Sequence, residues 1–218
     1  MKFRLIEDSQ QDYITVYHGT PYKKSAEVIL KTGLNSSKAT ASGGGNDKQP
    51  SIAGRNYLSL KVWKAVVYSC SRKSEKEPYG YVFSFRVNKN DLLPDEDEIG
   101  YQLIQYLKGE IKLPFSKNHL NSISKDNLLK LKSYDYNADF NDEENNNIFV
   151  MASEIGRNIM NKLTADEVIN IINNSDTVTT LKNNLIPIHV WKVNKNDFGE
   201  TFSSAPNDVM LNKLQQIK

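Results

Sequence analysis

The amino-acid sequence predicts an α+β domain whose core is a mostly antiparallel β-sheet with flanking helices. Two observations lead to this fold class. Segments with the alternation typical of strands occur three times before residue 90 and twice after residue 175, and helical patterns separate the two groups. A composition of 39% hydrophobic and 25% charged residues suits a globular protein, and we expect one domain spanning residues 1–218.

The first strand is expected at Asp12–Thr20, where Ile14 and Val16 share one face. It ends in His-Gly-Thr, a compact set of polar groups, and Pro21 prevents the strand from running on. Ser25–Thr32 then has the pattern of a short helix, with Ser25 as its N-cap.

Residues 35–55 show no hydrophobic periodicity and include three successive glycines. One interpretation is a plain surface connection. The other is a lid or binding loop, because a loop of about 20 residues is uncommon inside a compact domain. The glycines lack the Lys-Ser/Thr of a Walker loop and the spacing of a dinucleotide fold, so neither phosphate loop is predicted.

A strand, a buried helix and a second strand are expected next, at Asn56–Leu60, Val62–Cys70 and Gly80–Val87. The acidic run Asp95–Glu98 follows. It has two interpretations, a metal site or the start of a helix whose dipole it stabilises, and we favour the helix start.

The middle of the chain, about 99–147, is predicted to be a helical insertion rather than a separate domain. Its lysines allow two interpretations, a surface that follows nucleic-acid phosphates or an ordinary solvated helix face. These lysines are Lys112, Lys117, Lys125, Lys130 and Lys132.

The last third contains two helical patterns, two closing strands and a C-terminal helical tail at about 200–218. A capping box, Thr164–Glu167, opens the second helix. The expected segments are helices at Ala152–Leu163 and from Thr164, strands at Thr177–Leu181 and Ile186–Val193, and a helix at Asn207–Ile217.

Composition limits the classes of function. The net charge of +2 and pI near 8.4 neither favour nor exclude a nucleic-acid partner. The single Cys70 rules out an internal disulfide framework and favours a reducing compartment. We find neither a membrane-length apolar run nor a signal-peptide pattern, so we expect a cytoplasmic protein without a membrane partner. With three His and one Cys, we expect no metal site.

Two short motifs carry a resemblance to a known family. Tyr17-His18-Gly19-Thr20, followed by Tyr57-Leu58-Ser59, resembles the ADP-ribosyltransferases of the His-Tyr-Glu type, the diphtheria-toxin and poly(ADP-ribose) polymerase branch. In that family a second Tyr lies eleven residues after the first, as Tyr68 does here, and Ala65 takes a position where the polymerase branch commonly has Ser. The resemblance covers roughly residues 13–87 and implies a split antiparallel sheet.

The resemblance also implies a co-substrate, NAD⁺, and a role for each motif residue. Two tyrosines would sandwich the nicotinamide ring, the glycine backbone would meet its carboxamide, and the histidine with a hydroxyl group would hold a ribose. Arg55 would reach the pyrophosphate, or else is a solvated loop cation. The expected NAD⁺ contacts are His18, Gly19, Thr20, Arg55, Tyr57, Ser59 and Tyr68.

The family's catalytic Glu has two candidate positions here, and it usually comes from the start of a late strand. Glu154 is the more obvious late acid, but it lies in a helical pattern, whereas Asp176 directly precedes the strand pattern of Thr177–Leu181. Without that Glu we expect transfer of single ADP-ribose units, or chemistry like that of an RNA 2′-phosphotransferase.

The sequence therefore predicts a mono-ADP-ribosyltransferase with His18, Tyr57 and Glu154 or Asp176 as catalytic residues. Its acceptor would be RNA, DNA or protein. Its setting would be a toxin of a toxin–antitoxin or phage-defence system, or a phage-encoded effector, with a neutralising partner protein. Alternatives are a non-catalytic module that binds ADP-ribose or nucleic acid, and a structural protein without a ligand.

Overall fold

The computed structural model describes residues 12–35, 52, 54–70, 77–139, 142–196 and 206–217. The chain divides into two compact units, and each is described by itself. Unit 1 comprises Met1–Thr40, Gly54–Leu92 and Thr180–Lys218. Unit 2 comprises Ala41–Ala53 and Leu93–Thr179, and it includes the predicted helical insertion.

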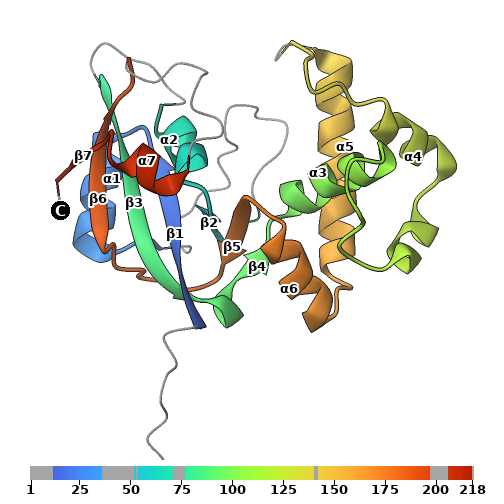
Figure 1. The fold of residues 1–218 in the computed structure, drawn as a ribbon, viewed down its shortest axis with the longest axis horizontal. Helices are drawn as coiled ribbons and strands as arrows, with labels where there is room; N and C mark the ends of the chain where they lie inside the picture. The colour runs from blue at the N-terminus through green and yellow to red at the C-terminus, as the bar shows by residue number, and fades with distance from the viewer. Residues whose placement is uncertain are drawn as a thin grey trace, which may run out of the picture. The chain divides into compact units, whose positions relative to one another are not determined.

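Unit 1 is built on an antiparallel sheet with the strand order β2-β1-β3-β6-β7 (Figure 1). The central pair is long and continuous, since Tyr13 lies opposite Asn88 at one end and Thr20 lies opposite Tyr81 at the other. The strands are β1 (Tyr13–Thr20), β2 (Asn56–Ser59), β3 (Tyr79–Asn88), β6 (His189–Asn194) and β7 (Gln215–Gln216).

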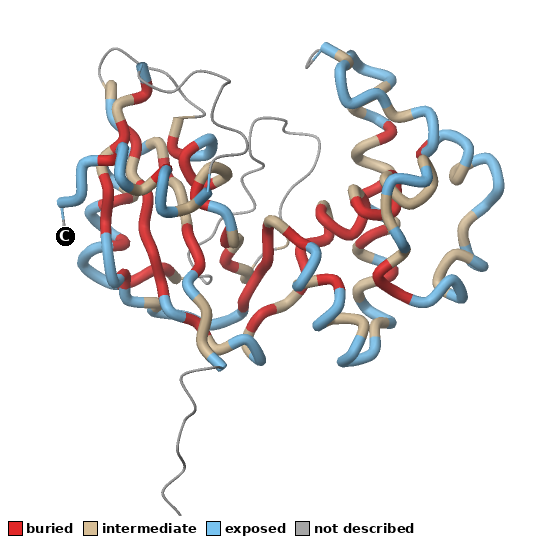
Figure 2. Tube along the Cα trace, in the orientation of Figure 1, coloured by how far each residue is buried: buried red, intermediate tan, exposed pale blue. Residues whose placement is uncertain are grey.

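Two helices share a hydrophobic cluster with the sheet of unit 1. They are α2 (Val62–Cys70) and α7 (Asn207–Leu211). Side chains from β1, β3 and β6 complete the cluster, and Figure 2 shows the buried length of these strands. Unit 1 also contains α1 (Lys23–Thr32) and a short 3-10 helix, η3 (Lys89–Asp91).

Unit 2 is mainly helical. Its two central helices, α3 (Glu96–Leu107) and α5 (Glu143–Met160), approach closely at two glycines. A Cβ added at Gly100 would lie 2.6 Å from the carbonyl oxygen of Ala152, and one added at Gly156 would overlap the carbonyl oxygen of Glu96. Glycine is therefore required at this crossing.

Unit 2 also contains shorter elements. They are η4 (Lys117–Ser122), α4 (Lys125–Lys132), α6 (Ala165–Asn173), β4 (Leu93–Pro94) and β5 (Thr177–Thr180). The two short strands pair antiparallel, with Leu93 opposite Thr179. The predicted capping box of α6 is confirmed, because the side chains of Thr164 and Glu167 each accept a backbone N–H of the other.

The acidic run before α3 is confirmed as a helix start. Asp95 is the N-cap and accepts a hydrogen bond from the backbone N–H of Asp97 at 3.0 Å. Among the described residues, no group of three or more His, Cys, Asp or Glu side chains is placed to hold a metal ion.

Four predicted elements have boundaries that are wrong by two residues or more. Helix α5 begins at Glu143, nine residues before the predicted start at Ala152, and ends at Met160. Helix α1 begins at Lys23, so Ser25 is not its N-cap; Tyr22 takes that position without a side-chain bond. Strand β6 begins at His189, three residues later than predicted. The C-terminal helix ends at Leu211, because Gln215–Gln216 pairs with β6 instead.

The predicted loop at 35–55 lies mostly outside the described residues. In the part of the chain that is described, no helix is both long and apolar enough to cross a membrane.

Candidate functional site

The structure brings His18 and Tyr57 together. His18 lies on β1 and Tyr57 on β2, and the imidazole Nδ1 of His18 is 3.1 Å from the backbone carbonyl oxygen of Tyr57. A carbonyl oxygen only accepts hydrogen bonds, so Nδ1 carries the proton and donates it. In the neutral ring, Nε2 then has a free lone pair and acts as an acceptor.

Burial keeps the imidazole neutral. It lowers the pKa of His18 from its ordinary value of 6.5, and the hydrogen bond to Tyr57 opposes this only in part. At neutral pH the ring therefore carries no charge. The site offers a fixed neutral acceptor, which suits a sugar hydroxyl as a donor.

Gly19 has a packing role beside His18. A Cβ built at Gly19 would overlap the carbonyl oxygen of Ala65 and would lie 2.9 Å from the backbone nitrogen of Ser69. Strand β1 thus lies directly against α2, and the small Ala65, which is 1% exposed, is part of this contact. Gly80 on β3 meets the backbone of Ser69 in the same way, although no motif in the sequence marks it.

The two tyrosines of the motif differ in exposure. Tyr57 is half-buried on β2, whereas Tyr68 lies on α2 and is 53% exposed. Because glycine contacts fix α2 against β1 and β3, the helix that carries Tyr68 has a defined place in unit 1. Stacking of a ring between these two side chains stays a prediction.

The two hydroxyl groups of the motif take part in local turns. Ser59 Oγ donates to the carbonyl oxygen of Lys61 and accepts from its backbone N–H, which shapes the turn from β2 into α2. Thr20 is buried, and its Oγ1 accepts from the backbone N–H of Tyr22 at 3.4 Å. The side chain of Asn207 also stabilises the turn from β2 into α2, because its Oδ1 accepts a hydrogen bond from the backbone N–H of Val62 at 2.8 Å.

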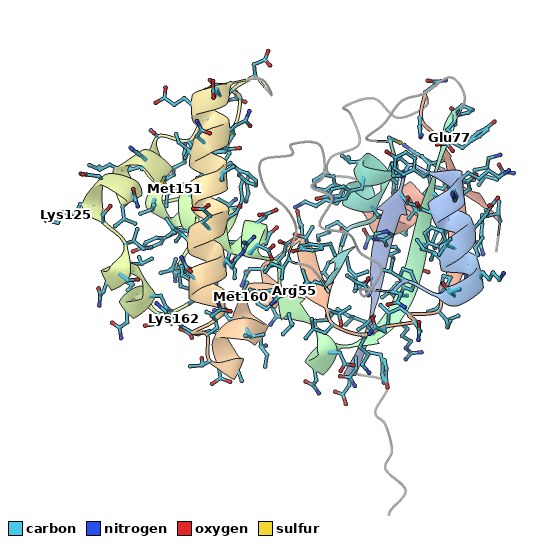
Figure 3. The ribbon with its side chains drawn as sticks, turned by 180° about the vertical axis from the view of Figure 1, so that it is seen from behind. Arg55, Glu77, Lys125, Met151, Met160 and Lys162 are labelled. Carbon is cyan, nitrogen blue, oxygen red and sulfur yellow. The ribbon has the colours of Figure 1, made fainter. Side chains whose placement is uncertain are left out.

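The segment before β2 is anchored to the rest of unit 1. Arg55, labelled in Figure 3, is half-buried, and the next residue, Asn56, is 2% exposed. The Asn56 side chain donates to the carbonyl oxygen of Lys182 at 2.8 Å, and Lys182 pairs with Asp91 at 2.8 Å. These bonds fix the start of β2, which directly follows Arg55.

A buried lysine holds the chain just after the His-Gly-Thr motif. Lys195 is 2% exposed, and its ammonium group donates to the carbonyl oxygen of Pro21 at 2.9 Å. Sequence reasoning missed this contact because a lysine directly after a strand such as β6 gives no sign of burial.

Both candidate acids belong to unit 2. Glu154 is exposed in the middle of α5 and lines a cavity of about 250 Å³ together with His119 and Lys162. Asp176 is half-buried and directly precedes β5. The other predicted site residues belong to unit 1, so the third catalytic residue stays a prediction.

Comparison of the chain with family models, with curated proteins and with solved structures gave no match.

Proposed function

We propose that this protein is a mono-ADP-ribosyltransferase, which cleaves NAD⁺ and transfers ADP-ribose to a macromolecule. The observation that carries the proposal is the hydrogen bond between His18 and Tyr57. It joins two motif residues 39 positions apart, and it gives the histidine one defined tautomer.

In the proposed reaction the bond between C1′ of the ribose and the nicotinamide nitrogen breaks. The bonding electron pair leaves with nicotinamide, and C1′ passes through an oxocarbenium-like state. An acceptor atom then donates its electron pair to C1′ and loses a proton. The enzyme must hold the ribose and the leaving group still while positive charge develops.

His18 suits the ribose side of this reaction. Its Nε2 would accept a hydrogen bond from a ribose hydroxyl while Nδ1 stays bound to the Tyr57 carbonyl. Because burial lowers its pKa, the ring adds no positive charge beside the developing cation. A protonated imidazole there would oppose bond breaking.

The nicotinamide side would be held by the tyrosines and by the backbone of Gly19. Stacking on Tyr57 and Tyr68 would contribute about 0.5–1.5 kcal/mol for each aromatic pair beyond burial. Arg55 would pair with the pyrophosphate of NAD⁺.

Of the two acids we infer that Asp176 is the catalytic one. The resemblance implies an acid at the start of a late strand, and Asp176 directly precedes β5, whereas Glu154 lies inside α5. Its carboxylate would stabilise the positive charge of the ribose and orient a hydroxyl group. With Asp in place of Glu, we expect single-unit transfer.

The proposed setting is a toxin or defence effector that consumes NAD⁺ in the cell that makes it, with an inhibitor protein that restrains it. The first experiment is to incubate the protein with NAD⁺ labelled in its adenylate part and with cell extract. We expect label on a macromolecule and release of nicotinamide. If the protein binds NAD⁺ but does not cleave it, the protein is a binding module instead.

A further inference from the structure

Charge is strongly segregated between the two units. Unit 1 holds 19 Lys and Arg residues against 10 Asp and Glu residues, whereas unit 2 holds 9 against 16. The net charges of +9 and −7 therefore add up to the chain's +2. A nearly neutral chain thus contains one strongly basic unit.

The acidic charge of unit 2 has a structural explanation, whereas among the described basic residues of unit 1 only Lys31 and Lys89 lie in a last helical turn, where the dipole favours a cation. Acidic side chains occupy the first turn of each α-helix of unit 2, where the helix dipole favours them. These side chains are Glu96, Asp97, Glu98, Asp126, Glu143, Glu144, Asp166 and Glu167. The other described lysines of unit 1 are spread over helices, turns and strands.

Several of these lysines are exposed and have no counter-ion within the described part of the chain. Lys24, Lys31, Lys61 and Lys89 form no ion pair with any other residue that the structure describes. They come from three separate places, α1, the turn before α2 and η3. NAD⁺ contains a single pyrophosphate, which one or two cations neutralise, so the co-substrate does not account for this excess.

Exposed tyrosines lie beside the cations of unit 1. Tyr79 is 39% exposed, and the ammonium group of Lys192 lies 3.6 Å from the centre of its ring. Tyr22 is 37% exposed and directly precedes Lys23. Exposed aromatic rings among cations are typical of surfaces that bind single-stranded nucleic acid, where bases stack and phosphates pair.

We propose that unit 1 binds the phosphate backbone of a single-stranded nucleic acid, and that this nucleic acid is the ADP-ribose acceptor. The second part rests on the proposed transferase function. A ring nitrogen or hydroxyl group of the nucleic acid forms the new bond to C1′, nicotinamide leaves with the old bonding pair, and the acceptor releases its proton. The acidic unit 2, including the lysines around α4, makes no such contact.

The test measures binding of a short fluorescein-labelled single-stranded RNA by anisotropy at several salt concentrations. The logarithm of the binding constant should fall linearly with the logarithm of the salt concentration, with a slope of about −0.7 for each phosphate contacted. In the variant Lys24→Gln/Lys31→Gln/Lys61→Gln we expect a slope flatter by about 2 and weaker binding at every salt concentration.

The matched control is Lys112→Gln/Lys125→Gln/Lys132→Gln, which changes the net charge equally through exposed lysines of unit 2. It should bind RNA like the wild type. An equal loss of RNA affinity in both variants, or RNA binding by the wild type that does not depend on salt, overturns the proposed surface.

Release of nicotinamide from NAD⁺ without any acceptor tests the transferase function separately. Nicotinamide release without RNA binding overturns this inference and leaves the transferase standing. RNA binding without release supports the surface and overturns the transferase. In the labelling experiment, label removed by nuclease supports a nucleic-acid acceptor, and label removed only by protease overturns it.

Discussion

The imidazole Nδ1 of His18 lies 3.1 Å from the backbone carbonyl oxygen of Tyr57, which links the end of one strand to its neighbour. In the same region Tyr17 lies opposite Ser59, so one backbone pair and one side-chain bond join β1 to β2. The bond decides which ring nitrogen carries the proton. It thereby leaves Nε2 as the acceptor in the proposed reaction.

The lowered pKa of His18 predicts a pH dependence of stability. The unfolded chain takes up the histidine proton near the ordinary pKa of 6.5, whereas the folded chain does so only at lower pH. The stability that the half-buried neutral ring contributes is therefore complete above pH 6.5 and is lost as the pH falls below it.

Urea unfolding at pH 7.5 and pH 5.5 checks this, with His18→Asn as the comparison because Asn has no such titration. We expect the wild type to lose more stability on acidification than the variant does. Equal losses would show that His18 titrates normally.

Gly19→Ala should destabilise the protein by about 2 kcal/mol, because the new methyl group would overlap the backbone of α2 at Ala65. The control is Gly54→Asn. Gly54 has a φ of +83°, which Asn tolerates, and apart from its chain neighbours no described residue has an atom within 4 Å of the position that a Cβ would take there. Denaturant unfolding of both variants measures the difference. An unchanged stability of Gly19→Ala would contradict the close packing of β1 on α2.

The N-cap of α3 should make the protein less stable as the pH rises. Burial, with the nearby Asp97 and Glu96 charges, raises the pKa of Asp95 to about 7. Between about 4 and 7 the folded state holds a proton that the unfolded state has lost, so the contribution of Asp95 to stability declines across that range.

Asp95→Asn keeps an oxygen that can accept from the backbone N–H of Asp97 and removes the titration. We expect its unfolding free energy to decline less than that of the wild type between pH 5 and pH 8. Parallel curves for the two proteins would mean that Asp95 is ionised throughout.

Asp176→Asn should slow nicotinamide release by about 10²–10³-fold, because it removes the negative charge that stabilises the ribose cation. Glu154→Gln is the matched control and should leave the rate near that of the wild type. The reverse pattern would assign the role to Glu154, and wild-type rates in both variants would reject both acids.

Local patterns were enough to predict several elements. The alternation along β1 and β3, the limits of α2 and the capping box of α6 all follow from residues close together in sequence. The motif residues His18 and Tyr57 were chosen through the family resemblance, and the structure places them near the end of β1 and near the start of β2.

Long-range contacts could not be predicted from one sequence. The bond from Lys195 to Pro21 spans 174 positions, and the bond from Asn207 to Val62 spans 145. Strand β7 forms because Ile217 donates its N–H to Val190, a pairing that outweighs helix propensity in a short terminal segment. The packing reason for Gly80 likewise depends on α2.

Nicotinamide release from NAD⁺ by His18→Asn and His18→Ala tests the central proposal most directly. Asn can still donate to the Tyr57 carbonyl in place of Nδ1, but it has no group at the position of Nε2. We predict that His18→Asn folds as stably as the wild type at pH 7.5 and releases nicotinamide at least about 100-fold more slowly than the wild type. His18→Ala should release nicotinamide no faster than His18→Asn. A wild-type rate in folded His18→Asn would contradict the assignment of His18 to the catalytic site.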